Sequence, residues 1–164
     1  SLEINLSINK ITPNSSNKDR IIQLFNRTNQ FNLTGNKFNT GLLNEKLVED
    51  NLYYYGSVSD RIGSEGLISV IGCKCDGKNL LIENYILSCR VFGRYFEELM
   101  LLPAFDYAIS IKSDIYFEFV DTGRNKVIKE FISKLTNNNH LPLKNIVKLH
   151  REFSKLPVKV LNNF

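Results

Sequence analysis

The chain has 164 residues, of which 43% are hydrophobic, and a net charge of +4 from 21 basic and 17 acidic side chains. This length suits one domain, residues 1–164, that buries about two thirds of its unfolded surface. No apolar run reaches the roughly 20 residues that cross a bilayer, and no secretory leader is evident, so we expect a soluble cytoplasmic protein that does not bind a membrane. The basic residues form no arm, so we expect no binding to nucleic acid.

The first third of the chain predicts one strand and two helices. Apolar and polar residues alternate over Leu2–Ile8, the period of a half-buried strand. Because the chain opens directly on this strand, we expect the domain to come from a longer protein. An apolar helical stripe follows over residues 21–25, with Asn17 or Asp19 as N-cap, and a second short helix is predicted over Leu42–Val48.

The middle of the chain predicts three antiparallel strands. Leu52–Val58, Leu67–Cys75 and Leu80–Leu87 have the apolar, β-branched composition of strands. Asp76-Gly77 between the last two is a strong signal for a tight hairpin turn. The run from Leu80 is apolar enough to be a central strand.

A polar turn containing Gly93 connects this central strand to a predicted helix. The first turn of a helix offers free backbone N–H groups and the positive end of its dipole, which together bind phosphate oxygens. Arg90 and Arg94 add positive charge on either side of the glycine. We therefore predict an anion site formed by Arg90, Val91, Phe92, Gly93 and Arg94.

The last part of the chain predicts further helices and strands. Pro103 is expected to kink or restart the helix that follows Gly93. A strand over Ile115–Val120 precedes a turn and the clearest amphipathic helix, residues 127–135. The tail predicts a loop over 137–139, a helix over Ile146–Phe153 and a last strand over Val158–Leu161.

The order of these elements predicts an α/β fold with a central, mostly antiparallel mixed sheet flanked by helices. It is the order of the GNAT acyltransferases, and Arg90-x-x-Gly93 resembles the R/Q-x-x-G-x-G/A signature with which those enzymes hold the pyrophosphate of coenzyme A. The turn also falls where that fold keeps it, after the fourth strand.

The three cysteines predict neither disulfides nor a metal site. Their number is odd, and the chain is large enough to fold without covalent links. Cys73-x-Cys75 lacks two further ligands nearby, because His140 and His150 lie in a different region.

Four segments resemble the C-terminal, GNAT-like domain of FkbH-like proteins. They are residues 1–3 (Ser-Leu-Glu), 28–34 (Thr-Asn-Gln-Phe-Asn-Leu-Thr), 60–67 (Asp-Arg-Ile-Gly-Ser-Glu-Gly-Leu) and 87–94 (Leu-Ser-Cys-Arg-Val-Phe-Gly-Arg). The turn Thr122-Gly-Arg-Asn125 is similar to a T-x-K-N element of the same family. The resemblance covers residues 1 to about 135.

The resemblance implies a function in carrier-protein chemistry. FkbH-like proteins take a glyceryl unit from bisphosphoglycerate, remove phosphate and load the acyl group onto the phosphopantetheine thiol of an acyl carrier protein, in polyketide-type biosynthesis. An upstream HAD-type phosphatase domain performs the first part. This chain has no D-x-D-x-T/V segment of the HAD type, so the resemblance implies the acyl-transfer half only.

The sequence departs from the family at two positions. The family's F-G-D-x-G segment reads Ile62-Gly-Ser-Glu-Gly66 here, which puts Ser64 at the aspartate position and the acid at Glu65. Tyr95 stands where the GNAT signature prefers glycine or alanine, and it could narrow the phosphate turn.

Cys89 is the candidate nucleophile. It ends a strand beside Arg90 and just before a predicted helix start, surroundings that favour the thiolate form. The alternative is a buried cysteine that acts as a small hydrophobe. The predicted turn would hold the phosphate of the carrier's phosphopantetheine, or of coenzyme A.

The candidate substrate-binding residues have structural alternatives too. Amide side chains around 28–34 could orient a glyceryl hydroxyl or the pantetheine amides, or could only satisfy the local backbone. Asp60 and Arg61 could contact substrate or form an ion pair. The candidates are Thr28, Asn29, Gln30, Asn32, Asp60, Arg61, Glu65 and Asn125.

Two other function classes remain open. One is a GNAT-like module that docks a carrier protein or the HAD domain without doing chemistry. The other is a small-molecule N-acetyltransferase that uses acetyl coenzyme A, which would use the phosphate turn but explains residues 28–34 poorly.

Overall fold

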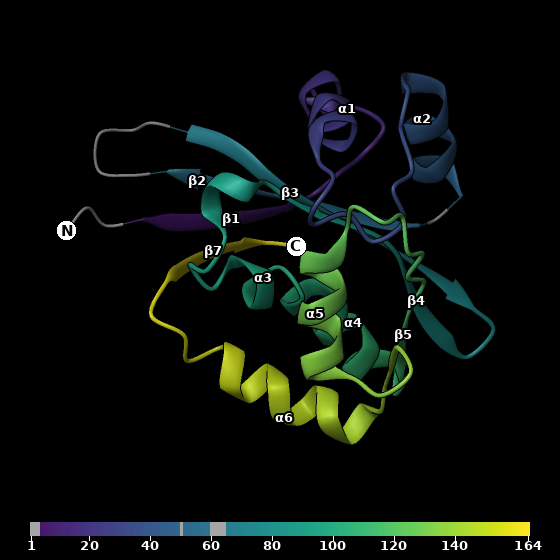
Figure 1. Ribbon diagram of the computed structural model, residues 1–164, viewed down its shortest axis with the longest axis vertical. Helices are drawn as coiled ribbons and strands as arrows, with labels where there is room; N and C mark the ends of the chain where they lie inside the picture. Colours follow the sequence, from purple (N-terminus) through teal and green to yellow (C-terminus); the bar gives the residue numbers. More distant parts are fainter. Residues whose placement is uncertain (1–3, 50, 60–64) are drawn as a thin grey trace.

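A seven-stranded mixed sheet forms the centre of the computed structural model, which describes residues 4–49, 51–59 and 65–164 (Figure 1). The strand order is β6-β5-β4-β3-β2-β1-β7, with β1–β7 and β4–β5 parallel and the other pairs antiparallel. The strands are β1 (Asn5–Lys10), β2 (Leu52–Ser59), β3 (Glu65–Asp76), β4 (Asn79–Leu87), β5 (Ile115–Phe117), β6 (His140–Leu141) and β7 (Lys159–Asn163). The predicted mostly antiparallel α/β sheet is therefore confirmed.

Helices cover both faces of this sheet (Figure 1). The first two lie on one face and the later ones on the other. They are α1 (Lys18–Arg27), α2 (Thr40–Val48), α3 (Phe96–Leu99), α4 (Leu102–Ile111), α5 (Lys126–Leu135) and α6 (Leu143–Phe153), with a 3-10 turn η1 (Cys89–Val91) after β4. In the part of the chain that is described, no helix is long and apolar enough to cross a membrane.

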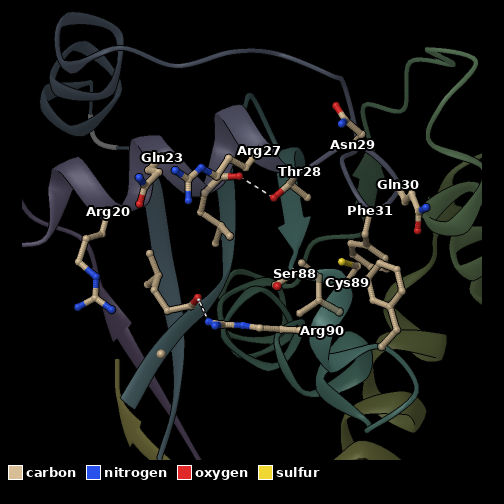
Figure 2. Close-up of a pocket in the computed structure, with 15 residues that line it drawn as sticks. Arg20, Gln23, Arg27, Thr28, Asn29, Gln30, Phe31, Ser88, Cys89 and Arg90 are labelled. Atoms are coloured by element: carbon tan, nitrogen blue, oxygen red, sulfur yellow. Dashed lines mark hydrogen bonds between the residues drawn. The ribbon is translucent and has the colours of Figure 1, made fainter. Parts of the chain in front are cut away.

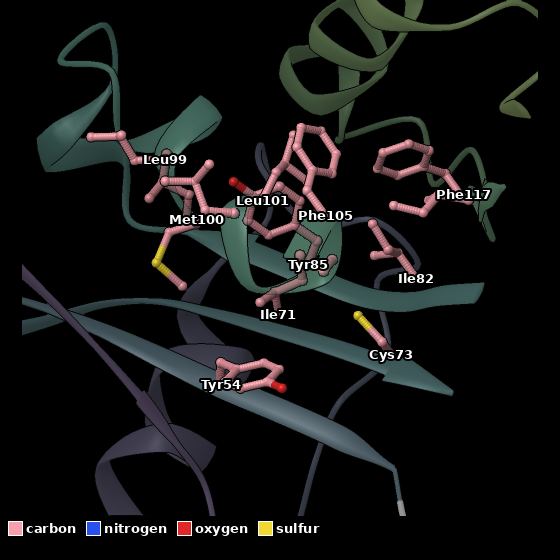
Figure 3. Packing of buried hydrophobic residues seen from close by; sticks show 14 of the residues in the cluster. Tyr54, Ile71, Cys73, Ile82, Tyr85, Leu99, Met100, Leu101, Phe105 and Phe117 are labelled. Atoms are coloured by element: carbon pink, nitrogen blue, oxygen red, sulfur yellow. The ribbon is translucent and has the colours of Figure 1, made fainter. Parts of the chain in front are cut away.

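Each face of the sheet has its own hydrophobic core. On the side of α1 and α2, Ile21, Phe25 and Leu43 pack with Val70 and Ile86 of the sheet. The larger core on the opposite side joins sheet residues to α3–α6, and Figure 3 shows part of it around Tyr85 and Phe105. The alternation of buried and less buried residues along β1, with Leu6 and Ile8 fully buried, follows the period of a strand.

The predicted hairpin between β3 and β4 is confirmed. Asp76 pairs with Asn79 across the turn, and Gly77 has a φ of +62°, a conformation that glycine adopts without steric cost. Pro103 restarts the chain as a separate helix, as expected, because it lies in the first turn of α4 where its missing N–H costs nothing.

The tail returns to the far edge of the sheet. β7 pairs in parallel with β1, so the last strand of the chain lies beside the first strand. The sequence predicted this strand but not its partner. The helix α6, which precedes β7, begins three residues earlier than expected. It contacts α4 through His150 Nε2, which lies 2.6 Å from Asp106 Oδ1.

Candidate functional site

A pocket of about 560 Å³ lies where β4 ends, between α1 and the turn that follows the strand (Figure 2). The walls come from α1, from the segment after it, from the start of β3 and from the β4 turn. The lining residues are Arg20, Gln23, Leu24, Arg27, Thr28, Asn29, Gln30, Phe31, Gly66, Leu67, Leu87, Ser88, Cys89, Arg90 and Phe92. Among these described lining residues three are arginines and none is acidic. A concave site of this charge favours an anionic ligand.

One wall of the pocket is a short segment, Phe31–Leu33, that pairs with β4 like a strand. The N–H of Leu33 donates to Tyr85 O at 3.0 Å, and the N–H of Leu87 donates to Phe31 O at 3.1 Å. β5 pairs with β4 only from Leu80 to Ile82, so this segment, which we call the strap, covers the β4 edge beyond the end of β5. The structural alternative for residues 28–34, amide side chains that satisfy the local backbone, did not include this pairing with β4.

The amides of Asn32 and Asn125 hold the strap in place. Asn32 is 1% exposed and bonds to Thr28 O, to the N–H of Thr34 and to the N–H of Gly35. Asn125, also 1% exposed, donates to Asn32 O and Val120 O and accepts from the N–H of Thr122. Both side chains therefore use their hydrogen-bonding groups inside the protein, and neither lines the pocket.

Three other predicted binding residues do line the pocket. Thr28 is buried and donates its hydroxyl to Leu24 O at 2.6 Å, which leaves its oxygen as an acceptor. Asn29 is partly exposed and Gln30 is exposed. Asp60, Arg61 and Ser64 lie outside the described residues, as does the side chain of Glu65.

Cys89 is exposed and lies in the pocket wall, in the 3-10 turn η1 directly after β4. The alternative of a buried cysteine on a central strand is wrong, because β4 ends at Leu87 and the chain turns outward before the thiol. In Figure 2 the Cys89 sulfur lies beside Phe31 of the strap. The geometry leaves the thiol accessible to a ligand in the pocket.

Arg90 crosses the pocket floor to the start of β3. Its Nη2 donates to Leu67 O at 2.9 Å, the dashed line beside Arg90 in Figure 2. A Cβ atom at Gly66 would stand 2.7 Å from this nitrogen, so the guanidinium can lie here only because residue 66 is glycine. One nitrogen anchors Arg90, and its positive charge stays at the pocket.

The turn after Arg90 differs from the predicted phosphate cradle. The N–H of Val91 donates to Ser88 O and that of Phe92 to Cys89 O, so both are used inside the 3-10 turn. The N–H of Gly93 donates to Glu97 Oε2 at 2.9 Å. The expectation of free N–H groups at these three positions is therefore wrong, because the protein supplies its own acceptors.

The helix that follows this turn is short. α3 has four residues, and its N-cap Tyr95 has a φ of +74°, a left-handed conformation that is unusual for a residue with a side chain. Arg94 is exposed and does not line the pocket. Tyr95 is 44% exposed, so its side chain is not part of the core.

The other cysteines are outside this site. Cys73 is fully buried on β3, and burial raises the pKa of its thiol far above the ordinary value, which makes it a poor nucleophile. Cys75 is exposed at the far end of β3 and lies 3.7 Å from the Tyr107 hydroxyl. Within the described ranges, no three His, Cys, Asp or Glu side chains are grouped so that they could hold a metal ion.

The basic side chains of α1 were missed by the sequence reasoning. Arg20, Gln23 and Arg27 are spaced by three and four residues, so they share one helix face, and all three line the pocket. The signal was present in this spacing and in the position of Arg27 directly before Thr28. It could not be told from an ordinary solvated helix face without the fold.

Comparison with known proteins gives a structural likeness only. Neither a protein-family model nor a curated protein sequence matches the chain. Naa20 from Chaetomium thermophilum, solved with a bisubstrate analogue, aligns with 94% of this chain and 96% of its own at TM-score 0.56 and 13% identity. A chimera of the spermidine N-acetyltransferase SpeG from Vibrio cholerae and hSSAT aligns over 87% and 98%, at TM-score 0.53 and 15% identity.

A third match is shorter. The IAA acetyltransferase from Bacillus cereus ATCC 14579 aligns over 68% of this chain at TM-score 0.47 and 15% identity, and the chain spans 64% of that protein, less than two thirds of its length. The sheet order, the helices on both faces and the whole-chain alignments with the first two structures agree with the predicted fold. The chain adopts the GNAT fold.

Proposed function

We propose that this chain is an acyltransferase that carries an acyl group on Cys89 and passes it to the phosphopantetheine thiol of an acyl carrier protein. The observation that supports this most strongly is the accessible Cys89 thiol in the wall of a pocket whose described lining holds three arginines and no acid. The resemblance to FkbH-like proteins supports a glyceryl group as the acyl unit. A HAD-type domain would supply that unit from bisphosphoglycerate.

The proposed transfer has two steps. The Cys89 sulfur attacks the carbonyl carbon of a donor thioester; the new C–S bond forms, the donor's C–S bond breaks and the donor thiol leaves with the proton that Cys89 gives up. The carrier's thiol then attacks the Cys89 thioester in the same way, which restores the Cys89 thiol. Positive charge from Arg90 beside the pocket stabilises the oxyanion in each step.

The polar residues of the pocket wall suit a hydroxylated acyl group. Asn29 and Gln30 offer amide donors and acceptors, and the Thr28 oxygen accepts. Asn32 and Asn125 act through the strap, whose position they fix. They are positioning residues in this proposal rather than groups that touch substrate.

N-acetyl transfer from acetyl coenzyme A is the second candidate. The names of the structurally similar proteins, Naa20 solved with a bisubstrate analogue and the SpeG chimera, support it, since the fold is shared. In this reaction an amine attacks the acetyl thioester directly, so no acyl group forms on Cys89.

The test is carrier loading followed by intact mass spectrometry. A glyceryl thioester and a holo acyl carrier protein are incubated with the wild-type chain, Cys89→Ala and the matched control Cys75→Ser, which changes an exposed thiol away from the pocket. We expect the wild type and Cys75→Ser to load the carrier and Cys89→Ala to be slower by at least about a hundredfold, the size of effect that loss of a nucleophile produces.

Undiminished loading by Cys89→Ala would refute the nucleophile. A parallel reaction with acetyl coenzyme A and amines separates the alternatives. Amine acetylation that persists in Cys89→Ala indicates the N-acetyltransferase, and carrier binding without any transfer indicates a docking module.

A further inference from the structure

Gly66, at the start of β3, leaves the space that the Arg90 guanidinium occupies at the pocket. A Cβ atom at residue 66 would stand 2.7 Å from Arg90 Nη2, 3.4 Å from Cζ and 3.6 Å from Nη1. Alanine and the guanidinium cannot both keep these places, because the first distance is shorter than the contacts that Cβ atoms make in proteins. The next residue along β3 supplies the anchor, since Leu67 O accepts from Nη2 at 2.9 Å. We call Gly66 and the Leu67 carbonyl the Arg90 seat.

The backbone itself does not require a glycine at this position. The φ of Gly66 lies outside the left-handed region, so alanine can adopt the same conformation. The residue pairs with Val58 of β2 inside a strand, where glycine weakens the sheet and often marks the close approach of another group. At Gly66 the group that approaches is the Arg90 guanidinium.

Two other strand glycines serve the packing of the core instead. A Cβ atom at Gly56 would collide with the Met100 sulfur and one at Gly72 with the Tyr53 ring, and both of these side chains are fully buried. Arg90, by contrast, is exposed. A methyl group added beneath it would therefore move the end of one flexible side chain and leave the core in place.

The seated guanidinium keeps a positive charge at the pocket. Its bond to Leu67 O is the one hydrogen bond that the Arg90 side chain makes to the described residues, and no described carboxylate forms an ion pair with it. In Figure 2 the side chain extends from the turn that carries Cys89 toward the β3 backbone. A long arginine with a single hydrogen bond has many rotamers open to it, so the space above Gly66 decides where this charge lies.

We propose that Gly66 is a positioning residue, which seats the Arg90 charge in the pocket that holds the Cys89 thiol and so makes this pocket favour groups that are, or become, negatively charged at that thiol. The inference rests on the proposed function for the reaction that the charge assists. The oxyanion that forms when Cys89 attacks a thioester is such a group. A charge that is already in place stabilises it more than a mobile one, because no reorganisation is needed.

Alkylation of Cys89 tests the seat without any acyl transfer. Iodoacetate is negatively charged and iodoacetamide is neutral, and peptide mapping gives the rate of each at Cys89, with the exposed Cys75 as internal reference. We expect the ratio of the iodoacetate rate to the iodoacetamide rate at Cys89 to fall about two- to threefold in Gly66→Ala and in Arg90→Gln, with no change at Cys75. A ratio at Cys89 that is the same in Gly66→Ala as in the wild type would overturn the proposal.

Carrier loading tests the consequence for the reaction. We expect Gly66→Ala to lower kcat at least about tenfold with little change in KM, because the charge acts on the transition state. Gly41→Ala on α2 is the matched control, since a Cβ atom there meets Asn39 Oδ1 at an ordinary 3.5 Å. This control should load the carrier as the wild type does.

The double variant Gly66→Ala/Arg90→Gln separates displacement of the guanidinium from damage to β3. Glutamine has no guanidinium to displace, so we expect the double variant to load the carrier and to melt as Arg90→Gln alone does. If Gly66→Ala lowers kcat as much in the Arg90→Gln background as in the wild type, the glycine serves the strand itself and the proposal is overturned. A wild type that shows the charge preference at Cys89 without acyl transfer would refute the proposed function and leave the seat in place.

Discussion

Three cysteines occupy three different environments in this fold. Cys73 is buried and its pKa is raised, Cys75 is exposed at a hairpin end, and Cys89 is exposed in the pocket. The sequence identified Cys89 from its place after a strand and beside Arg90. The sequence could not predict that Arg20 and Arg27 of α1 line the same pocket, because this depends on how α1 packs on the sheet.

Variants of Asn32 and Asn29, which lie in one segment, should show different effects on the stability of the fold and on substrate binding. Asn32→Ala leaves the partly buried N–H groups of Thr34 and Gly35 and the buried carbonyl of Thr28 without partners, so we expect a loss of about 2–3 kcal/mol in the free energy of unfolding. Asn29→Ala removes a partly exposed side chain and should change it by less than about 0.5 kcal/mol.

Urea unfolding measures both variants, and carrier loading measures their activity. We expect Asn29→Ala to keep its stability and lose affinity for the acyl substrate. Equal stability of the two variants would contradict the structural role of Asn32.

The strap shows what local sequence patterns cannot predict. The residues 28–34 have the composition of a loop, and their β pairing depends on β4, more than 50 residues away. The strap also explains why β5 ends at Phe117 rather than at the predicted Val120. The N–H of Val120 donates to Leu33 O at 3.0 Å, so the chain after β5 leaves β4 and bonds to the strap.

Hydrogen exchange followed by NMR tests the strap. We expect the amides of Leu33 and Leu87 to exchange at rates typical of central sheet residues, because both are buried and bonded across the strap–β4 contact. The amide of Asn36, which bonds only to the nearby Thr34 hydroxyl in an exposed loop, is the internal comparison and should exchange far faster. Rates for Leu33 as fast as those for Asn36 would show that the strap does not pair with β4.

Across the whole molecule, the sequence predicted the helices and strands better than their partners. The hairpin turn, the amphipathic α5 and the restart at Pro103 are local signals, and the structure confirms them. The parallel pairing of β7 with β1 joins residues about 150 positions apart, so local patterns could not predict it. α6 leads from β6 at one edge of the sheet to β7 at the other, along the face opposite α1 and α2 (Figure 1).

The tail is joined to the body by Asp114, and this contact should give a pH-dependent stability. The hydrogen bond from His140 and then the N–H of Leu143 lower the pKa of the Asp114 carboxyl. A lowered pKa in the folded state stabilises the protein above the unfolded value, about 3.9, and this stabilisation is lost as the pH falls through the folded pKa.

Asp114→Asn should therefore be less stable than the wild type at pH 7, and the difference should shrink below pH 4. Urea unfolding at both pH values measures this, with Glu152→Gln, an exposed change on α6, as the control. A difference between wild type and Asp114→Asn that stays constant from pH 7 to pH 3 would contradict the assignment.

The measurement that tests the central claim most directly is the detection of an acyl group on Cys89. The chain is incubated with a glyceryl thioester in the absence of carrier, digested and mapped by tandem mass spectrometry. We predict the acyl mass on the Cys89 peptide alone, discharged when holo-carrier is added. Loading of the carrier without any acyl group on Cys89, or equal labelling of Cys75, would contradict the proposed mechanism.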